Sequence, residues 1–251
     1  MILTSKNNPL IKETAALKEK KGRKEKGLFL VEGVKMAREC QKSGLDIERI
    51  FLSENYSGER FDESKTVVLS EDVLRFISDE KTPQGVICRV KIPSNELKAP
   101  NGKCLFLDGV SDPGNMGAII RTANAAGYDE LYLTRDCTDP YSPKSVRASM
   151  SGVFFTKIYI GERTEILSLL TESNTPIFVA DMNGENIFSF QAPEKFALAI
   201  GNEANGISEE TFSAANRTLR IPMKETQESL NAAVAAGISM YLLAKDEFSS
   251  K

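Results

Sequence analysis

FALAIGNEANGI, residues 196–207, is an apolar run followed at once by a loop rich in glycine and polar residues. Runs of the same kind recur through the second half of the chain, and stretches of helical length separate them. Short apolar runs that alternate with helices predict an α/β fold with a parallel sheet covered on both faces. The predicted strands are residues 104–110, 130–134, 156–160, 176–182, 196–203 and 217–223, and the predicted helices are residues 115–126, 143–151, 164–173, 208–215 and 231–247.

Three of these strand ends carry dense polar and glycine content. They read DGVSDPGNMG (108–117), GNEANGI (201–207) and IPMKETQESLN (221–231). Because ligands of parallel sheets bind at the carboxyl ends of the strands, we expect a ligand site here. None of the loops has a dinucleotide fingerprint or a P-loop, which argues against NAD(P) and ATP. The architectural alternative is that these are ordinary strand-to-helix turns, with Ser229 or Asn231 capping the last helix.

The chain contains no histidine. This absence excludes catalysis by Ser-His-Asp or Cys-His groups and any histidine-ligated metal. The four cysteines form no CxxC pair, so we expect buried core residues in a reducing compartment and no metal site. They are Cys40, Cys88, Cys104 and Cys137.

The composition is that of an ordinary globular protein, with 41% hydrophobic and 27% charged residues among 251. No stretch has the roughly 18 uninterrupted apolar residues of a membrane span, and the first residues lack the apolar core of a signal peptide. We therefore expect a cytoplasmic protein with no membrane partner.

The net charge of −3 conceals an asymmetry. Residues 1–28 carry eight Lys or Arg and three Glu, a formal charge of +5, which leaves −8 for the remainder. A basic arm on an acidic body favours binding to a phosphate backbone. The alternative is a solvated helix face held by Glu–Lys pairs. The candidate phosphate contacts are Lys12, Lys18, Lys20, Lys21, Arg23 and Lys24.

The first part of the chain predicts a separate, smaller α/β domain. Its expected elements are helices at residues 8–21 and 33–43, a third helix capped by Ser70, and strands at residues 28–31, 47–53, 66–69 and 85–91. The stretch PSNELKAPNGK has two Pro, one Gly and no apolar pattern, and so predicts a linker. The predicted division is a first domain at 1–92, a linker at 93–103 and a second domain at 104–251.

At the three loops the sequence resembles the SpoU (TrmH-like) family of RNA 2′-O-ribose methyltransferases. The matching residues are Asn115, Gly117 and Arg121 in the first motif, Gly201, Glu203 and Gly206 in the second, and Ile221, Pro222, Met223, Ser229, Leu230, Asn231, Ala235 and Gly237 in the third. The stretch SKNNPLIKETAALKEKKGRKEKGLFLVEG, residues 5–33, resembles the substrate-binding extension of the rRNA-modifying branch. The likeness spans nearly the whole chain.

The resemblance implies S-adenosylmethionine as the cofactor and RNA, most readily 23S ribosomal RNA, as the substrate. It implies a deep trefoil knot in the C-terminal domain, a homodimer formed through that domain, and an N-terminal domain like the small RNA-binding modules of ribosomal proteins. The implied catalytic residues are Asn115, Arg121, Glu203, Ser229 and Asn231. The implied cofactor contacts, mainly through the backbone, are Gly201, Ile221, Met223 and Leu230.

The family's mechanism gives the arginine at position 121 the role of a base, yet a guanidinium stays protonated in proteins. We therefore expect Arg121 to clamp the adjacent RNA phosphate and to make the ribose hydroxyl more acidic through its field. The proton acceptor is then the phosphate, Glu203 or water. Two positions depart from the family pattern, since Glu225 and Ser151 stand where glycine is usual.

Two other functions are compatible with the same fold. One is 2′-O-methylation of tRNA, which the basic N-terminal domain makes less favoured than rRNA. The other is a non-catalytic RNA-binding or assembly protein, against which the intact motif residues argue.

Overall fold

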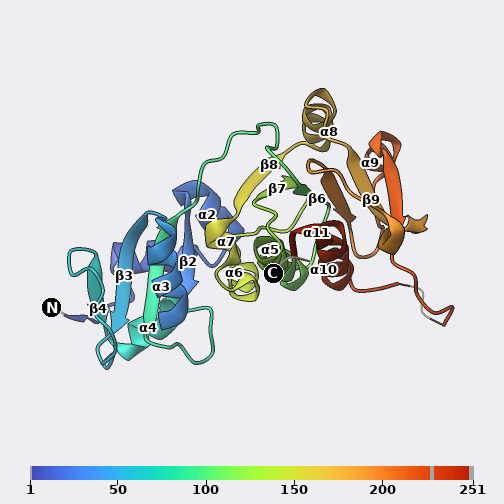
Figure 1. Cartoon of the computed structure of the whole chain (residues 1–251). Helices are drawn as coiled ribbons and strands as arrows, with labels where there is room; N and C mark the ends of the chain where they lie inside the picture. The colour runs from blue at the N-terminus through green and yellow to red at the C-terminus, as the bar shows by residue number, and fades with distance from the viewer. Residues whose placement is uncertain (1, 227–228, 249–251) are drawn as a thin grey trace. The chain divides into compact units, whose positions relative to one another are not determined.

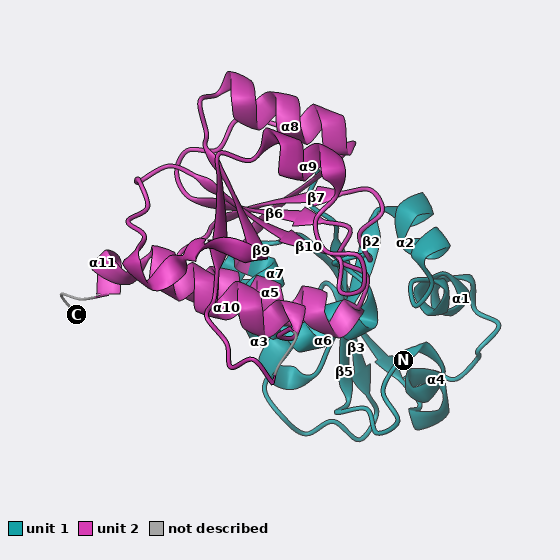
Figure 2. Ribbon diagram, turned by 90° about the vertical axis from the view of Figure 1, so that its right-hand side faces the viewer, with its two compact units in different colours: residues 1–94, 139–154 teal, residues 95–138, 155–251 magenta. Residues whose placement is uncertain are grey.

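The computed structural model describes residues 2–226 and 229–248, so Gln227 and Glu228 of the third motif lie outside the described residues. The chain divides into two compact units, shown in two colours in Figure 2. Unit 1 comprises residues 1–94 and 139–154, and unit 2 comprises residues 95–138 and 155–251.

Unit 2 is built on a six-stranded sheet in which every neighbouring pair is parallel. The strand order is β11-β9-β10-β6-β7-β8. The strands are β6 (Cys104–Asp108), β7 (Glu130–Thr134), β8 (Lys157–Gly161), β9 (Ile177–Asn186), β10 (Ala197–Gly201) and β11 (Arg217–Arg220). The predicted α/β class and parallel sheet are thus confirmed.

Helices cover both faces of this sheet (Figures 1 and 2). On one face lie α8 (Arg163–Glu172) and α9 (Glu209–Ala214), and on the other lie α5 (Pro113–Ala125) and α10 (Ala232–Leu243). The unit also has the 3-10 turn η1 (Ile187–Ser189) and the short helix α11 (Lys245–Phe248). The predicted single helix at 231–247 is therefore two helices. None of the described helices is long and apolar enough to cross a membrane.

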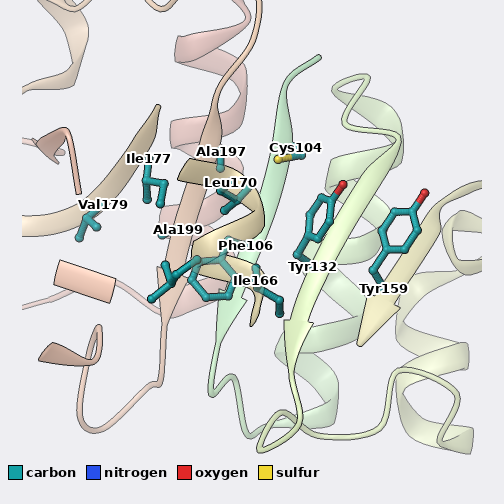
Figure 3. Close-up of a cluster of buried hydrophobic side chains, with 11 residues drawn as sticks. Cys104, Phe106, Tyr132, Tyr159, Ile166, Leu170, Ile177, Val179, Ala197 and Ala199 are labelled. Atoms are coloured by element: carbon teal, nitrogen blue, oxygen red, sulfur yellow. The ribbon is translucent and has the colours of Figure 1, made fainter. Parts of the chain in front are cut away.

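The core between the sheet and α8 joins aromatic rings of adjacent strands to aliphatic residues of the helix (Figure 3). The rings of Tyr132 and Tyr159 stack with centroids 4.9 Å apart. Ile166 and Leu170 of α8 belong to the same buried cluster. Burial of such residues is the main force that holds the layers together. All four cysteines are buried and unpaired, as predicted.

Part of the predicted linker is attached to unit 2. The Asn95 side chain donates to the Ile158 carbonyl of the edge strand β8 at 2.9 Å. The Tyr132 hydroxyl donates to the Lys98 carbonyl at 2.7 Å, and the Asn101 N–H donates to Glu130 at 3.0 Å. Single polar contacts of this kind produce no periodic pattern in the sequence. Composition alone therefore predicts a linker and does not reveal its attachment to unit 2.

Unit 1 contains a five-stranded mixed sheet in the order β1-β4-β3-β5-β2. The pairs β1/β4 and β3/β4 are parallel, whereas β3/β5 and β2/β5 are antiparallel. Its elements agree with the predicted ones with two exceptions: the helix predicted at 8–21, and β1, which at two residues is too short to show a pattern. They are β1 (Ile2–Leu3), β2 (Leu28–Glu32), α3 (Val34–Ser43), β3 (Ile47–Ser53), β4 (Thr66–Leu69), α4 (Glu71–Ile77) and β5 (Val86–Lys91).

The predicted helix at 8–21 is wrong, because the chain forms two helices, α1 (Pro9–Ala16) and α2 (Lys20–Lys26). At the break between α1 and α2, the Arg23 guanidinium donates to the carbonyls of Leu17 and Lys18, both at 2.8 Å. A side chain at Gly22 would come within 2.1 Å of the Ala16 carbonyl oxygen, so only glycine permits this corner.

Residues 139–154 belong to unit 1 by contact, although they lie between β7 and β8 along the chain. They include α6 (Pro143–Ser149) and most of α7 (Gly152–Phe155). Arg23, only 3% exposed, binds Asp139 through Nη2 at 2.6 Å and Nε at 2.7 Å. The compact units therefore differ from the predicted division at 92 and 104. The Arg23 guanidinium is bound to Asp139 and to two backbone carbonyls, which disfavours the predicted contact with a phosphate.

Replacing Arg23 with Met keeps part of the apolar stem but removes the cation that donates to Asp139 Oδ2 and to two backbone carbonyls. We expect Arg23→Met to lower the free energy of unfolding by about 3 kcal/mol, since one partner of a buried ion pair is removed. Urea denaturation measures the change. Lys24→Met, on an exposed neighbour, should shift it by less than about 0.5 kcal/mol. Equal effects of the two variants would contradict the role given to Arg23.

Candidate active site

The candidate site lies where the strand order reverses. In the sheet β6 has β7 on one side and β10 on the other, so the chain leaves β6 in one direction and later returns beside it. Crevices at the carboxyl ends of such strands are the usual ligand sites of open α/β sheets. Loop 1 (residues 108–115) follows β6, loop 2 (201–208) follows β10, and loop 3 (221–231) follows β11.

Glu203 joins loop 2 to loop 1 through four hydrogen bonds. Its Oε2 accepts from the Ser111 N–H at 3.0 Å and from the Ser111 hydroxyl at 2.8 Å. Its Oε1 accepts from the Asp112 N–H at 3.2 Å and from Asn115 Nδ2 at 2.9 Å. Partial burial raises the pKa of Glu203, but the hydrogen bonds from Asn115 and Ser111 outweigh it and lower the pKa to about 2. A carboxylate held in this way is a poor proton acceptor at neutral pH.

Asn231 extends this chain of hydrogen bonds to loop 3. Its Nδ2 donates to Asn115 Oδ1 at 2.9 Å. Its Oδ1 caps α10 by accepting from the N–H groups of Ala233 at 3.0 Å and Val234 at 3.2 Å. Asn231 is therefore a helix cap, as the architectural alternative held, and also a member of the site. The structure brings Asn115, Glu203 and Asn231, from three separate loops, into one network.

A pocket of about 590 Å³ lies beside this network. Its walls are loops 2 and 3, the start of α10 and the middle of β9. The volume is typical of a site for a small organic molecule. The residues predicted to contact a cofactor all line it: Gly201, Ile221, Met223 and Leu230. Among the predicted catalytic residues, Glu203, Ser229 and Asn231 line it as well.

Loop 2 folds back tightly on the end of β10 and lays its main chain along the pocket. Asn202 and Gly206 exchange backbone hydrogen bonds, both at 2.9 Å. A Cβ at Gly201 would lie 2.3 Å from the Gly206 backbone, and Gly206 has a φ of 70°. These two positions require glycine, because a side chain would collide at the first and strain the backbone at the second.

Arg121 stands apart from the other predicted catalytic residues. It lies on α5 six residues after Asn115, which turns it by about 120° around the helix from that residue. It is exposed and lines no part of the pocket, and its side chain has no hydrogen bond or ion pair to any residue that the structure describes. Within one chain, the structure does not bring Arg121 to the pocket.

A shallow apolar groove runs along α5 and α10 on the other side of Asn231. Its lining includes Ala118, Thr122, Val234 and Tyr241. Val234 is 50% exposed and Tyr241 43% exposed, although both are large apolar side chains. We name this surface the α5/α10 groove.

The predicted phosphate contacts of unit 1 fall into two groups. Lys18 is occupied, because its ammonium donates to the Phe76 carbonyl at 2.9 Å and lies 5.8 Å from the centroid of that ring. Lys21 lies 3.8 Å from Glu25, the exposed pair that the solvated-face alternative expects. The exposed lysines among the six candidates are Lys12, Lys20, Lys21 and Lys24.

Some residues of the site were not predicted from the sequence. Ser111 donates twice to Glu203, and Asp181 and Met182 of β9 line the pocket. No spacing in the sequence singles out Ser111. The stretch PIFVADM predicts a strand, but its position between β10 and β11, which puts Asp181 at the pocket, depends on strand order. No cluster of three or more possible metal ligands occurs among the residues that the structure describes.

Neither of the two departures from the family pattern falls on a residue with a positive φ. Among the described residues other than glycine, only Met150 and Asn174 have a positive φ. Glu225 and Ser151 therefore do not use the backbone conformation that favours glycine.

The chain matches two protein-family models. Residues 102–241 match the SpoU rRNA Methylase family, and residues 8–88 match an MRM3-like substrate binding domain. The first match covers all three loops of the site, and the second covers most of unit 1.

Individual proteins resemble the chain over nearly its full length. The 23S rRNA (guanosine(2553)-2'-O)-methyltransferase RlmP of Bacillus subtilis (strain 168) is 30% identical over 244 residues, covering 96% of this chain and 98% of that protein. The crystal structure of an AdoMet-bound rRNA methyltransferase from Sinorhizobium meliloti has a TM-score of 0.88 at 27% identity and covers 98% of each chain. A structure concerning 2-OH methylation of C/U34 on tRNA has a TM-score of 0.54 at 28% identity, and covers 61% of this chain and 94% of the other.

The lowered pKa of Glu203 predicts how its contribution to stability depends on pH. The folded-state pKa of about 2 lies below the ordinary 4.5, so the stabilisation is complete above pH 4.5 and is lost as the pH falls towards 2. We expect Glu203→Gln to be less stable than the wild type near neutral pH and the difference to shrink below pH 4.5. Denaturation midpoints between pH 2 and 7 test this.

Glu194→Gln is the matched control, because Glu194 is exposed and has no hydrogen bond or ion pair among the described residues. Its stability should follow that of the wild type throughout. A Glu203→Gln difference that stayed constant down to pH 2 would contradict the hydrogen-bonded anion.

Proposed function

The chain belongs to the SpoU rRNA methylase family, and from this membership we propose that it transfers a methyl group from S-adenosylmethionine to a ribose 2′-hydroxyl of ribosomal RNA. The observation that carries the proposal is the network Glu203–Asn115–Asn231, which ties the three motif loops together beside a pocket of suitable size. Relatives that match along almost the whole chain are described as rRNA methyltransferases, one of them with AdoMet bound.

The pocket is chemically suited to S-adenosylmethionine. The apolar side chains of Ile221, Met223 and Leu230 offer a surface for the adenine ring, and the folded-back loop 2 forms the wall beside it. Bound there, the cofactor supplies a methyl group on a positively charged sulfur. The protein's main task would then be to hold the ribose oxygen in line with that methyl group.

The side chains around the pocket divide this task. Glu203 stays ionised and keeps loop 1 against loop 2, so it is a positioning residue rather than the proton acceptor. The amides of Asn115 and Asn231 are fixed by their mutual hydrogen bond beside the pocket. Arg121 clamps the RNA phosphate and favours ionisation of the hydroxyl through its charge. The acceptor of the proton is then the phosphate or water.

Ribosomal RNA is favoured over tRNA by the extent of the matches. The rRNA relatives match both units, including the MRM3-like substrate binding domain at residues 8–88. The tRNA-related structure covers 61% of this chain. A non-catalytic role is disfavoured because the hydrogen-bond network and the pocket are intact.

The α5/α10 groove supports a homodimer. We propose that a second copy covers it, because Val234 and Tyr241 expose apolar surface beside the catalytic network and the family pairs through this domain. Such pairing gives Arg121, which lies away from the pocket of its own chain, a place near a shared RNA site. The deep trefoil knot of the family is the proposed path of the C-terminal domain, and the cytoplasm is the proposed location.

Incubation with labelled S-adenosylmethionine and unmodified 23S rRNA tests the activity. We expect label in rRNA, at a linkage that resists alkali because the 2′-oxygen is blocked, and none in tRNA. Arg121→Met should lower kcat by about a hundredfold, the range found for a single charge-stabilising donor. The Kd for the cofactor should not change, because Arg121 does not line the pocket. Arg60→Met, an exposed arginine of unit 1, is the control, and label in tRNA alone would contradict the substrate.

The exposed lysines of α2 predict a change in the salt dependence of RNA binding. Replacing Lys20, Lys21 and Lys24 with Ala should flatten the log–log slope by about 0.7 to 0.9 for each phosphate that the protein no longer neutralises. Filter binding at several salt concentrations measures the slope, with Lys157→Ala in unit 2 as the control. An unchanged slope would assign these lysines to a solvated helix face.

A further inference from the structure

We propose that Arg163, which lies in none of the three motif loops, is a positioning residue for the cofactor pocket and acts through the buried Asp108. The inference rests on the proposed function, since it concerns the pocket assigned to S-adenosylmethionine. Arg163 is the first residue of α8 and follows the end of β8, which is the edge strand farthest from the pocket in sheet order.

Asp108 connects loop 1 to the end of loop 2. It is the last residue of β6 and only 2% exposed. Its Oδ2 accepts from the Ser208 N–H at 2.9 Å and from the Ser208 hydroxyl at 2.7 Å. The Ser208 hydroxyl also accepts from the Thr211 N–H at 3.3 Å and so caps α9. One carboxylate oxygen therefore fixes the point where loop 2 becomes a helix.

The other oxygen of Asp108 is neutralised by Arg163. Arg163 Nε donates to Asp108 Oδ1 at 2.6 Å, and Nη2 donates to Asp136 at 2.9 Å. Its Nη1 lies 3.9 Å from Glu210 of α9. Carboxylates from three elements thus surround the guanidinium, so it is committed to the protein and cannot take the role of an RNA clamp.

Loop 2 is consequently held at both ends on one short segment of chain. At its start, Asn202 Nδ2 donates to the Gly109 carbonyl at 2.8 Å, and Glu203 accepts from Ser111 and Asp112. At its end, Ser208 is bound to Asp108. Every residue from Gly201 to Ile207 lines the pocket. The shape of that wall depends on both anchors.

Removing Arg163 would leave the Asp108 carboxylate buried without a cation. An unpaired buried charge is costly, and the chain relieves the cost by protonating Asp108 or by letting water reach it. Either response weakens the hold on Ser208 and releases the end of loop 2. Cofactor affinity should therefore fall although Arg163 lies outside the pocket lining.

The test compares Arg163→Met with Arg135→Met. Arg135 also pairs with a carboxylate beside this sheet, Glu162 at 2.7 Å, but both side chains are largely exposed and both lie outside the pocket lining. We expect Arg163→Met to raise the Kd and the KM for S-adenosylmethionine by about tenfold, the effect of losing one charge-assisted hydrogen bond. The kcat at saturating cofactor and the KM for RNA should stay within twofold. Arg135→Met should change none of these.

Calorimetric titration of the folded variants gives the Kd directly. A merely structural role for Arg163 would reduce the active fraction, so that kcat falls while the KM for the cofactor stays constant, and this result would overturn the proposal. Arg163→Lys, which restores a cation to Asp108, should recover part of the affinity. No recovery would also count against the proposal.

The outcome separates this inference from the proposed function. Unchanged cofactor affinity in Arg163→Met, with normal binding by the wild type, would overturn the inference alone. Failure of the wild type to bind S-adenosylmethionine would overturn the proposed function and the inference together.

Discussion

The arrangement of the site depends on the carboxylate of Glu203, which accepts four hydrogen bonds. Glu203 accepts from two backbone N–H groups, a hydroxyl and an amide, all of them on loop 1. Glu203 itself is exposed, so these donors act by holding its carboxylate in place, and loop 1 supplies them only when it lies against loop 2. The pairing of loops that are 88 or more residues apart in sequence is thereby made specific. Asn115 and Asn231 extend the same network to the third loop.

Other parts of unit 2 hold the three loops in this arrangement. The parallel sheet places the ends of β6 and β10 side by side, and the switch in strand order opens the crevice between them. Glycines at positions 201 and 206 let loop 2 return on itself. The charges of Asp108 and Arg163 fix its far end. Side chains outside the pocket lining are therefore part of the support of its wall.

The sequence predicted the periodic features of the fold and the chemistry of the motifs. Apolar runs predicted nearly every strand, and the resemblance to the SpoU family singled out Glu203, Asn115 and Asn231. Features that depend on a single distant contact could not be predicted. The break between α1 and α2 depends on Arg23 reaching two carbonyls, and the position of Asp181 at the pocket depends on the order of strands. Neither leaves a pattern along the chain.

The placement of residues 139–154 bears on how the protein can be dissected. The chain passes between the two units three times, after residues 94, 138 and 154. No single cut separates them, and a fragment beginning at residue 104 would carry Asp139 and Tyr141 without the Arg23 and Phe29 that they contact in the intact chain. The N-terminal portion is thus not a removable module. Residues 139–154 add buried side chains such as Tyr141 to unit 1, although along the chain they lie between two strands of unit 2.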